Sequence, residues 1–251
     1  MRAIILAAGK GRRLRPITDE THKCLLEFGG RTLIQRYLDD FEQLGIHKVT
    51  LVLGHKMDMV RDHVGTQRGS VQIDYLENPL HHRGSILSMA IASQHFDDDV
   101  VIMDADVLYH PELLRCLVQS NNTNCQLMDH SYTETGEECK VAALQGRVVA
   151  NNRVIEVPYD EIGEGLGFLR LNQNSAQRYR ELLYDFMKDD NFDCEYEDPL
   201  EMLMKEHIVG FEPTGGLPWC EIDFVEDIEH ARNNVLPSIE ARLKDASISP
   251  S

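Results

Sequence analysis

The sequence predicts an α/β protein in three layers, with helices on both faces of a mixed, mostly parallel sheet in a Rossmann-like arrangement. The first observation is that short apolar runs, typical of buried strands, alternate with segments whose apolar residues recur at helical spacing. The second is that several of these runs end in glycine-rich or acidic turns. Such alternation gives parallel sheets, which bind ligands beyond the carboxyl ends of their strands.

The first half of the chain shows this alternation most regularly. We expect strands at residues 3–6, 48–53, 71–76 and 100–103, and helices at 31–44, 57–63, 84–95 and 111–119. In the first of these helices Leu33, Tyr37 and Phe41 share one face, and Gly45 supplies a C-terminal stop. Pro111 suits the first turn of the last helix.

After about residue 124 the pattern changes to short strand-like pieces separated by turns. We expect strands at 125–130, 140–144, 148–149, 154–157, 166–171, 209–211 and 219–222, and helices at 175–187, 199–206 and 224–234. The whole of residues 1–240 is expected to form one domain, with 124–240 completing the sheet. Residues 241–251 are expected to form a polar tail with a frayed end.

The composition excludes several classes of protein. The 251-residue chain is 42% hydrophobic and has a formal net charge of −17, so we expect no nucleic-acid partner, which would need a basic face. No apolar run approaches the ~20 residues of a membrane span, and the first apolar strand leaves no room for a signal peptide, so we expect a soluble cytoplasmic protein. The six cysteines contain no C-x-x-C pair, which predicts reduced thiols and no zinc. Whether the chain forms a homo-oligomer stays open.

A turn rich in glycine and cations follows the first predicted strand. It contains Gly9, Gly11, Arg12 and Arg13, and Lys23 lies a few residues further on. Glycine lets backbone N–H groups approach phosphate oxygens, and the cationic side chains neutralise their charge, so the turn predicts a polyphosphate site. The P-loop pattern is absent, and the dinucleotide-binding pattern fails because Leu14 occupies its third glycine position.

Two pairs of carboxylates also follow predicted strands. Asp104 and Asp106 come after the strand at 100–103, and Glu221 and Asp223 come at the end of the strand at 219–222. Residues two apart in an extended chain point to the same side. Magnesium uses few protein carboxylates and completes its octahedron with water and substrate phosphates, so these pairs beside a phosphate loop predict a Mg²⁺ site.

Residues 6–35 read LAAGKGRRLRPITDETHKCLLEFGGRTLIQ, which resembles the opening of the sugar-phosphate and choline-phosphate nucleotidyltransferases, roughly LAAGxGxRLxPLTxxxPKxLLxxxGxPLI. The matching positions are Leu6, Ala7, Ala8, Gly9, Gly11, Arg13, Leu14, Pro16, Thr18, Lys23, Leu25, Leu26 and Gly30. The resemblance implies the nucleotidyltransferase fold, with the backbone of residues 6–9 against the nucleobase. It also implies that Arg13 holds the β- and γ-phosphates and Lys23 the α-phosphate. One departure is His22, where the family usually has proline.

The resemblance also implies which carboxylates bind metal. Asp106 matches the first metal ligand, with Asp104 beside it at the nucleotide. Residues 219–227, WCEIDFVED, are similar to the family's W-x-E-x-D-x-x-E-D motif. On this basis Asp223 is the second ligand, Glu221 an additional one, and Asp227 a support for the closing helix near its N-terminus.

A third set of motifs is similar to the choline-phosphate and aminoethylphosphonate cytidylyltransferase branch. These motifs are ENPLHHRGSILSM at 77–89, GEGLG at 163–167 and YEDPL at 196–200. They imply nucleotide contacts from Asn78, Gly84 and Ser85. They also imply acceptor contacts from a set of polar residues after residue 124, namely Lys140, Glu164, Tyr196, Glu197 and Asp198. Lys140 would face the acceptor phosphate. The shortage of aromatic residues there favours a primary amine over a quaternary ammonium.

Together these features predict a Mg²⁺-dependent cytidylyltransferase. It would join CTP to a small phosphorylated or phosphonate alcohol or amine, of the 2-aminoethylphosphonate or phosphocholine type, and release pyrophosphate. Residues 1–123 would be the nucleotide-binding half and 124–240 the acceptor-binding half. Two alternatives stay open: a sugar-1-phosphate nucleotidyltransferase using UTP, dTTP or GTP, and a non-catalytic nucleotide-binding module.

Overall fold

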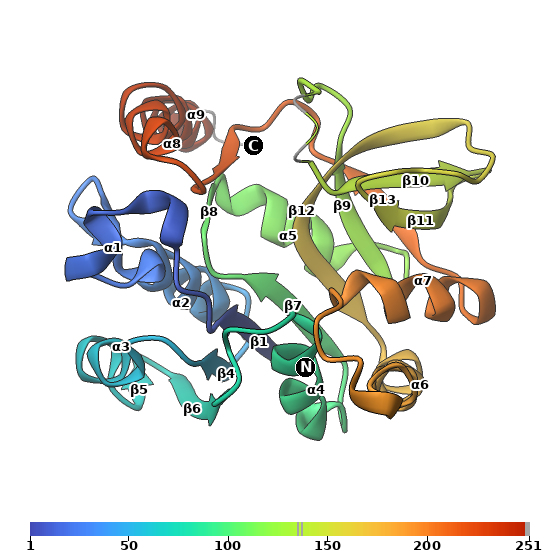
Figure 1. The fold of residues 1–251 in the computed structure, drawn as a ribbon. Coiled ribbons are helices and arrows are strands. Elements are labelled where there is room, and N and C mark those ends of the chain that lie inside the picture. The colour runs from blue at the N-terminus through green and yellow to red at the C-terminus, as the bar shows by residue number, and fades with distance from the viewer. Residues whose placement is uncertain (135, 137, 249–251) are drawn as a thin grey trace.

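The computed structural model describes residues 1–134, 136 and 138–248, with side chains described as far as residue 245, and within them a ten-stranded sheet forms the centre of the fold (Figure 1). The parallel centre of this sheet consists of β7 (Val100–Asp104), β1 (Arg2–Ala7), β4 (Lys48–Leu53) and β6 (Val71–Glu77). The short β5 (Gln67–Arg68) adds an antiparallel edge next to β6.

The second half of the chain extends the same sheet through antiparallel pairing. The long strand β12 (Glu161–Leu171) lies against β7 and continues to β10 (Lys140–Leu144) and β11 (Arg147–Asn152). It also pairs with β9 (Cys125–Asp129), which is followed by β13 (Gly210–Pro213). Two small hairpin-like pairs lie apart from this sheet: β2 (Glu27–Phe28) with β3 (Arg31–Thr32), and β8 (Val107–Tyr109) with β14 (Trp219–Glu221).

Helices cover both faces of the sheet, as the sequence predicts. One face carries α2 (Leu33–Gln43), α3 (Met57–Val64) and α5 (Pro111–Gln119), whose buried side chains share a core with the inward residues of β1 and β4. The other face carries α4 (Ile86–Ala92), α6 (Gln173–Phe186) and α7 (Glu197–Glu206). The α/β class with a mixed sheet is therefore confirmed.

A third core cluster joins the two ends of the chain. The helices α8 (Val225–His230) and α9 (Leu236–Ile248) flank a π-helical segment, η5 (Ala231–Val235). Their apolar residues pack against Leu14 and Phe28, both fully buried. Leu14 belongs to the short 3-10 helix η1 (Arg12–Leu14), which is followed by α1 (Ile17–Glu20) and a second 3-10 helix, η2 (Lys23–Leu25). The cation-rich turn therefore rests on the C-terminal helices, which is visible in Figure 1 where α8 and α9 lie beside the dark-blue segment.

Three sequence expectations are wrong in detail. Residues 154–157 do not form a strand: they belong to the connection between β11 and β12, and Val154 is 70% exposed. The helix expected from residue 84 begins at Ile86, because Gly84 and Ser85 instead bind a distant segment described below. The tail expected to fray is helical as far as Ile248, and residues 249–251 lie outside the described residues. Within the described residues, no helix has the length and apolar character needed to cross a bilayer.

Candidate active site

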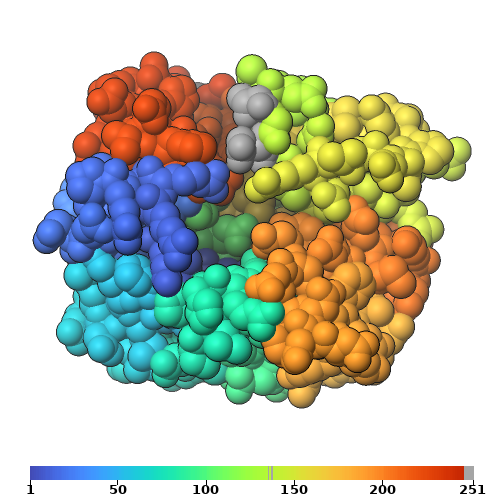
Figure 2. Space-filling model, in the orientation of Figure 1, coloured from blue at the N-terminus to red at the C-terminus, as the bar shows by residue number. Residues whose placement is uncertain are grey.

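A cleft of about 680 Å³ lies at the carboxyl ends of β1 and β7. Figure 2 shows the hollow at the centre of this face, between the blue N-terminal turn, the teal segment that precedes α4 and the orange segment that precedes α7. Most of the residues predicted from the sequence line it: Leu6, Ala7, Gly9, Gly11, Arg13, Lys23, Ser85, Asp104, Asp106, Glu164, Tyr196, Glu197, Asp198, Glu221 and Asp223. The fold thus brings together residues up to 217 positions apart, from Leu6 to Asp223.

Four predicted site residues lie outside this lining. The carbonyl of Ala8 accepts a hydrogen bond from His55 N at 3.2 Å. Asn78 is buried and donates to Ser88 Oγ at 2.9 Å. Gly84 contacts the segment before α7, and Lys140 Nζ lies 2.7 Å from Glu134 Oε1.

The turn that carries Asp106 is held by a tyrosine of α2. Tyr37 Oη lies 3.0 Å from the carbonyl oxygen of Asp104 and 2.8 Å from that of Val107, and it accepts a hydrogen bond from Val107 N at 3.0 Å. Its ring is buried in the core, so the hydroxyl is fixed. The sequence pattern shows Tyr37 only as part of an apolar helix face, and its contact with this turn depends on residues about 70 positions away.

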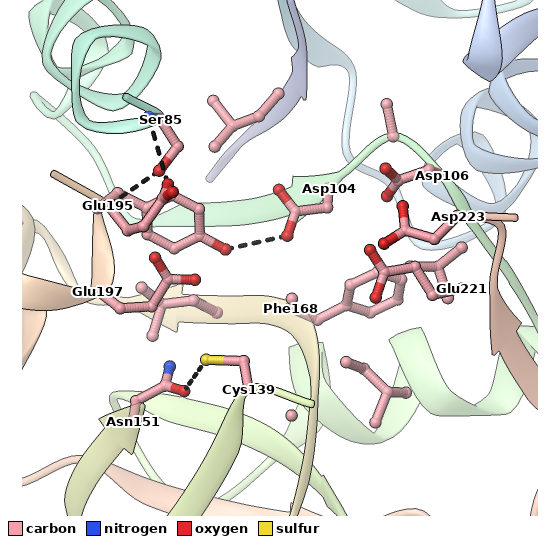
Figure 3. A pocket seen from close by; sticks show the side chains of 18 of the residues that line it. Ser85, Asp104, Asp106, Cys139, Asn151, Phe168, Glu195, Glu197, Glu221 and Asp223 are labelled. Carbon is pink, nitrogen blue, oxygen red and sulfur yellow. Dashed lines mark hydrogen bonds between the residues drawn. The ribbon is translucent and has the colours of Figure 1, made fainter. Parts of the chain in front are cut away.

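Three carboxylates meet at one end of the cleft, where Figure 3 shows the side chains of Asp106, Glu221 and Asp223 close together. One oxygen from each lies within 4.8 Å of the others. Asp106 Oδ1 is buried and has no hydrogen-bond partner among the described residues. Hard oxygen ligands with an unsatisfied buried oxygen fit a Mg²⁺ ion, as the sequence predicts. Burial in the cleft, followed by repulsion from Asp106 and Asp223, raises the pKa of Glu221 to about 8.

The cations of the turn reach the same three-carboxylate cluster. Lys23 Nζ lies 2.6 Å from both Asp106 Oδ2 and Asp223 Oδ1, and Arg13 Nη2 lies 2.8 Å from Asp223 Oδ2. Burial disfavours the charged form of Lys23, but Asp106 and Asp223 outweigh it and raise the lysine pKa above its usual value. The lysine is therefore a permanent cation in this cleft.

The backbone around these residues is fixed locally. His22 Nδ1 accepts a hydrogen bond from Cys24 N at 3.2 Å and caps η2. The histidine therefore fixes the start of η2 at a position where nucleotidyltransferases usually have proline. Burial lowers the pKa of His22 to about 4, which keeps the ring neutral and able to accept. Asp227 accepts from the backbone N–H groups of Asp223 and Phe224 at 2.8 and 2.7 Å, as expected of a support at the start of α8.

The other end of the cleft is an acidic wall. Figure 3 shows Glu195 and Glu197 there, with Asp104 between them and the three-carboxylate cluster. Burial, then the charge of Glu195, raises the pKa of Glu197 to about 7. Burial, then Glu138, raises that of Glu164 to about 7. Among the described residues no lysine or arginine pairs with these carboxylates, so the wall suits a positively charged group.

Asp104 is held in place from two sides. Tyr196 Oη donates to Asp104 Oδ2 at 3.0 Å. A Cβ at Gly167, whose φ is +68°, would lie 2.2 Å from the same oxygen, so only glycine leaves room for this carboxylate. Burial and the charges of Asp106 and Glu197 raise the pKa of Asp104 well above its usual range.

The segments on either side of the cleft mouth are joined by a set of bonds that we call the clasp, between residues 83–86 and 192–196. Arg83 makes a two-bond ion pair with Asp193, at 2.9 and 2.7 Å. Gly84 N donates to the carbonyl of Phe192 at 2.9 Å, and Tyr196 N donates to Ser85 Oγ at 2.9 Å. A Cβ at Gly84 would lie 2.2 Å from the carbonyl oxygen of Cys194. Gly84 is therefore needed for close contact between the two segments.

Sequence reasoning missed several residues of the cleft. Besides Tyr37, these are polar residues of the second half that line it: Cys139, Asn151, Asn152, Arg153 and Glu195. Cys139 Sγ donates to Asn151 Oδ1 at 3.0 Å, and burial raises the pKa of the thiol, so this cysteine is un-ionised. Glu195 stands directly before the YEDPL segment, which is the one signal that could have found it.

These features define a class of protein: an α/β fold that presents a cationic glycine turn, a three-carboxylate cluster and an acidic pocket at one cleft. A protein-family model described as "Nucleotidyl transferase" matches residues 2–138. The chain belongs to this family.

Individual relatives differ in how much of their length matches. The chain is 30% identical over 113 residues to a UTP–glucose-1-phosphate uridylyltransferase of Haloferax volcanii, covering 45% of this chain and 46% of that protein. It is 23% identical over 256 residues to a CTP:phosphoglutamine cytidylyltransferase of Campylobacter jejuni, covering 91% and 98%. It is 31% identical over 118 residues to a CMP-5′-(3-aminopropyl)phosphonate synthase of Streptomyces rubellomurinus, covering 47% and 19%. The chain thus spans half or less of two of these relatives and nearly all of the third.

Solved structures share the whole fold. The inositol-1-phosphate CTP transferase of T. maritima superposes with a TM-score of 0.75 at 18% identity, covering 95% of this chain and 96% of that one. The CTP:phosphocholine cytidylyltransferase of Streptococcus pneumoniae superposes with a TM-score of 0.71 at 21% identity, covering 92% and 97%. At these identities the likeness establishes the three-layer fold.

Proposed function

We propose that this protein is a Mg²⁺-dependent cytidylyltransferase, which transfers CMP from CTP to a small phosphorylated or phosphonate acceptor that carries an amine. The observation that carries the proposal is the division of one cleft into two ends. One end joins Arg13 and Lys23 to the three carboxylates, and the other is an acidic wall that pairs with no lysine or arginine of the described part of the chain. A nucleoside triphosphate suits the first end and an amine the second.

The reaction would be an in-line displacement at phosphorus. An oxygen of the acceptor phosphate or phosphonate attacks the α-phosphorus of CTP, and the bond to the pyrophosphate oxygen breaks, so pyrophosphate leaves with the electron pair. The attacking oxygen is already ionised at neutral pH, so no general base is needed. A Mg²⁺ ion on Asp106, Asp223 and Glu221 would supply charge neutralisation at the phosphates. Lys23 would orient the α-phosphate, and Arg13 the β- and γ-phosphates.

The names of the relatives support CTP over other nucleotides. The Campylobacter protein, which matches this chain nearly end to end, is a CTP-dependent enzyme whose acceptor is phosphoglutamine. The Streptomyces protein is named for a CMP-linked aminopropylphosphonate. Both named acceptors contain nitrogen, which agrees with the acidic wall formed by Glu195 and Glu197.

One observation favours a second candidate. The Haloferax relative is named for UTP and glucose-1-phosphate, and it is 30% identical to this chain over 113 residues. A sugar-1-phosphate nucleotidyltransferase is therefore the alternative. Such an acceptor has no cation to pair with the carboxylates of Glu195 and Glu197.

The test is pyrophosphate release in the presence of Mg²⁺. CTP, UTP, ATP, GTP and dTTP are each combined with phosphocholine, 2-aminoethylphosphonate, phosphoglutamine, glucose-1-phosphate and inositol-1-phosphate. Release with CTP and a nitrogen-containing acceptor supports the proposal and names the acceptor. Release only with UTP or dTTP and a sugar phosphate replaces it with the alternative.

A further inference from the structure

The strongest unexplained feature of the cleft is the position of Lys23. Its Nζ lies between Asp106 Oδ2 and Asp223 Oδ1, 2.6 Å from each. Its side chain is 13% exposed, and the two aspartate side chains are 22% and 25% exposed, so all three groups are largely shielded from water. Such short contacts between ions are strong charge-assisted hydrogen bonds.

Lys23 is thus bound to the carboxylates on which a divalent metal would depend. A Mg²⁺ ion needs its oxygen ligands at about 2.0–2.1 Å, whereas an ammonium lies at about 2.7–2.9 Å from the same oxygens. Both cations would therefore occupy nearly the same space and repel one another at short range. The carboxylates of Asp106 and Asp223 can serve the lysine or the metal, but not both in this arrangement.

The remaining oxygen of Asp106 shows that the lysine is an incomplete substitute. Asp106 Oδ1 is buried and has no hydrogen-bond partner among the described residues, although the lysine lies on the other oxygen of the same carboxylate. A metal with several coordination positions can satisfy an oxygen that one ammonium does not reach. The three-carboxylate cluster therefore has capacity for a more highly charged ion.

We propose that Lys23 is an internal cation that occupies the metal position and makes divalent-metal binding depend on the nucleotide. This inference rests on the proposed function for the identity of the nucleotide. The phosphates of CTP offer Lys23 a new anionic partner, and the metal that accompanies them replaces the ammonium on Asp106 and Asp223. Each group exchanges one partner for another of the same sign, so no charge is left buried and unpaired during the exchange. Without nucleotide, a metal must displace the lysine with no compensation.

The test measures the affinity of the nucleotide-free protein for Mn²⁺ alone, by calorimetry or from the EPR signal of free Mn²⁺. Lys23→Met keeps most of the side-chain length and removes the charge. We expect it to bind Mn²⁺ about tenfold or more tightly than the wild type, because a like charge has left the site. The matched control is Lys56→Met. Lys56 Nζ binds the carbonyls of Thr18 and Asp19 near the same turn, away from the carboxylates, so this variant should bind Mn²⁺ as the wild type does.

Equal or weaker Mn²⁺ binding by a folded Lys23→Met variant would overturn the inference. So would an equal gain in Lys56→Met, since that would indicate a general charge effect. If Lys23→Met does not fold, the wild type alone decides the question. Its affinity for Mn²⁺ should rise about tenfold or more when CTP is added, beyond what the Mn²⁺–CTP complex in solution explains, and an unchanged affinity would overturn the proposal.

These outcomes are independent of the turnover assay. The Mn²⁺ affinities of the nucleotide-free variants do not involve an acceptor or pyrophosphate. If no acceptor supports pyrophosphate release but Lys23→Met gains metal affinity, the proposed function fails and the role of Lys23 stands. If CTP turnover is found but Lys23→Met gains no affinity for Mn²⁺, the proposed function stands and the proposed role of Lys23 fails.

Discussion

The variant Gly84→Ala tests whether Gly84 contacts the nucleotide or instead holds together the clasp between residues 83–86 and 192–196. The resemblance to nucleotidyltransferases implies that Gly84 contacts the nucleotide, whereas the structure places it against the backbone before α7. The new Cβ would lie 2.2 Å from the carbonyl oxygen of Cys194, where real contacts essentially never fall under 3.0 Å. The two segments must therefore separate by about 0.8 Å or more, since backbone atoms cannot rotate away as a flexible side chain can.

The magnitude follows from the bonds that this separation breaks. The hydrogen bond from Gly84 N to the carbonyl of Phe192 would lengthen from 2.9 Å beyond bonding distance, and the bond from Ile86 N to Cys194 O is already 3.4 Å long. Two lost backbone hydrogen bonds reduce the free energy of unfolding by about 2 kcal/mol. Because residues 195–198 line the acceptor end of the cleft, we also expect the acceptor KM to rise more than the CTP KM.

Urea denaturation and steady-state kinetics measure these two effects. Gly9→Ala is the matched control, since Gly9 has nothing within 4 Å of the position of a Cβ and belongs to the cation-rich turn, for which we propose nucleotide binding. We expect it to leave the unfolding free energy unchanged and to affect CTP rather than the acceptor. A Gly84→Ala protein of wild-type stability, or one impaired only toward CTP, would refute the structural reasoning.

Four further predictions concern other parts of the molecule. Asp106→Asn should lower the rate of pyrophosphate release about 10³-fold or more, because it removes a charged metal ligand. Tyr37→Phe should lower the unfolding free energy by about 1–2 kcal/mol in urea and weaken Mn²⁺ binding, since the carbonyls of Asp104 and Val107 and the N–H of Val107 lose the hydroxyl to which they bond. Leu14→Ala should cost about 3–5 kcal/mol in the same assay, because Leu14 is fully buried against α8 and α9. Glu197 has a pKa raised to about 7 by burial, so the folded state keeps a proton that the unfolded state loses, and stability falls as the pH rises from about 4.5 to 7. Glu197→Gln should therefore stabilise the protein relative to wild type more at pH 8 than at pH 4.

Each of these has a result that would contradict it. Unimpaired turnover by Asp106→Asn would exclude this residue as a metal ligand. A Tyr37→Phe protein with wild-type Mn²⁺ affinity would show that the turn at residues 104–107 keeps its conformation without the tyrosine hydroxyl. A loss under about 1 kcal/mol in Leu14→Ala would show that the C-terminal helices are not packed on η1. A pH-independent difference between Glu197→Gln and wild type would show that the pKa of Glu197 is the same in the folded and unfolded states.

The sequence predicts those parts of the site in which the chemistry is local. The glycine turn at 9–15 and the carboxylates at 104–106 and 221–223 are visible because the residues that act together are neighbours in the chain and follow recognisable strands. The sequence does not predict contacts that depend on distant segments. Tyr37 looks like any apolar helix residue until the turn at 104–107 is placed over its hydroxyl, about 70 residues later. The clasp depends on the backbone carbonyl of Cys194, and the order of side chains in a sequence does not indicate which backbone atoms will be in contact.

The same limit explains the errors in the elements. Residues 154–157 are mostly β-branched, as in a strand, yet they pair with no strand of the described part of the chain, and Val154 and Val157 are exposed. The helical spacing of the last residues is weak, and α9 forms because η5 and Leu236 bury an apolar face against Phe28 and Leu14. Tertiary packing decides both segments against their local pattern.

The packing of α8 and α9 on the cationic turn has a consequence for how the protein is made. Translation proceeds from the N-terminus, so the cation-rich turn leaves the ribosome early and the helices that cover it leave last. Until residues 228–239 have been synthesised, Leu14 and Phe28 lack the apolar surface against which they are buried. Asp223, the partner of Lys23, is likewise 200 residues away in the chain. The segment that is made first is thus packed last, and in a nascent chain that stops short of α9 one wall of the cleft is not yet packed.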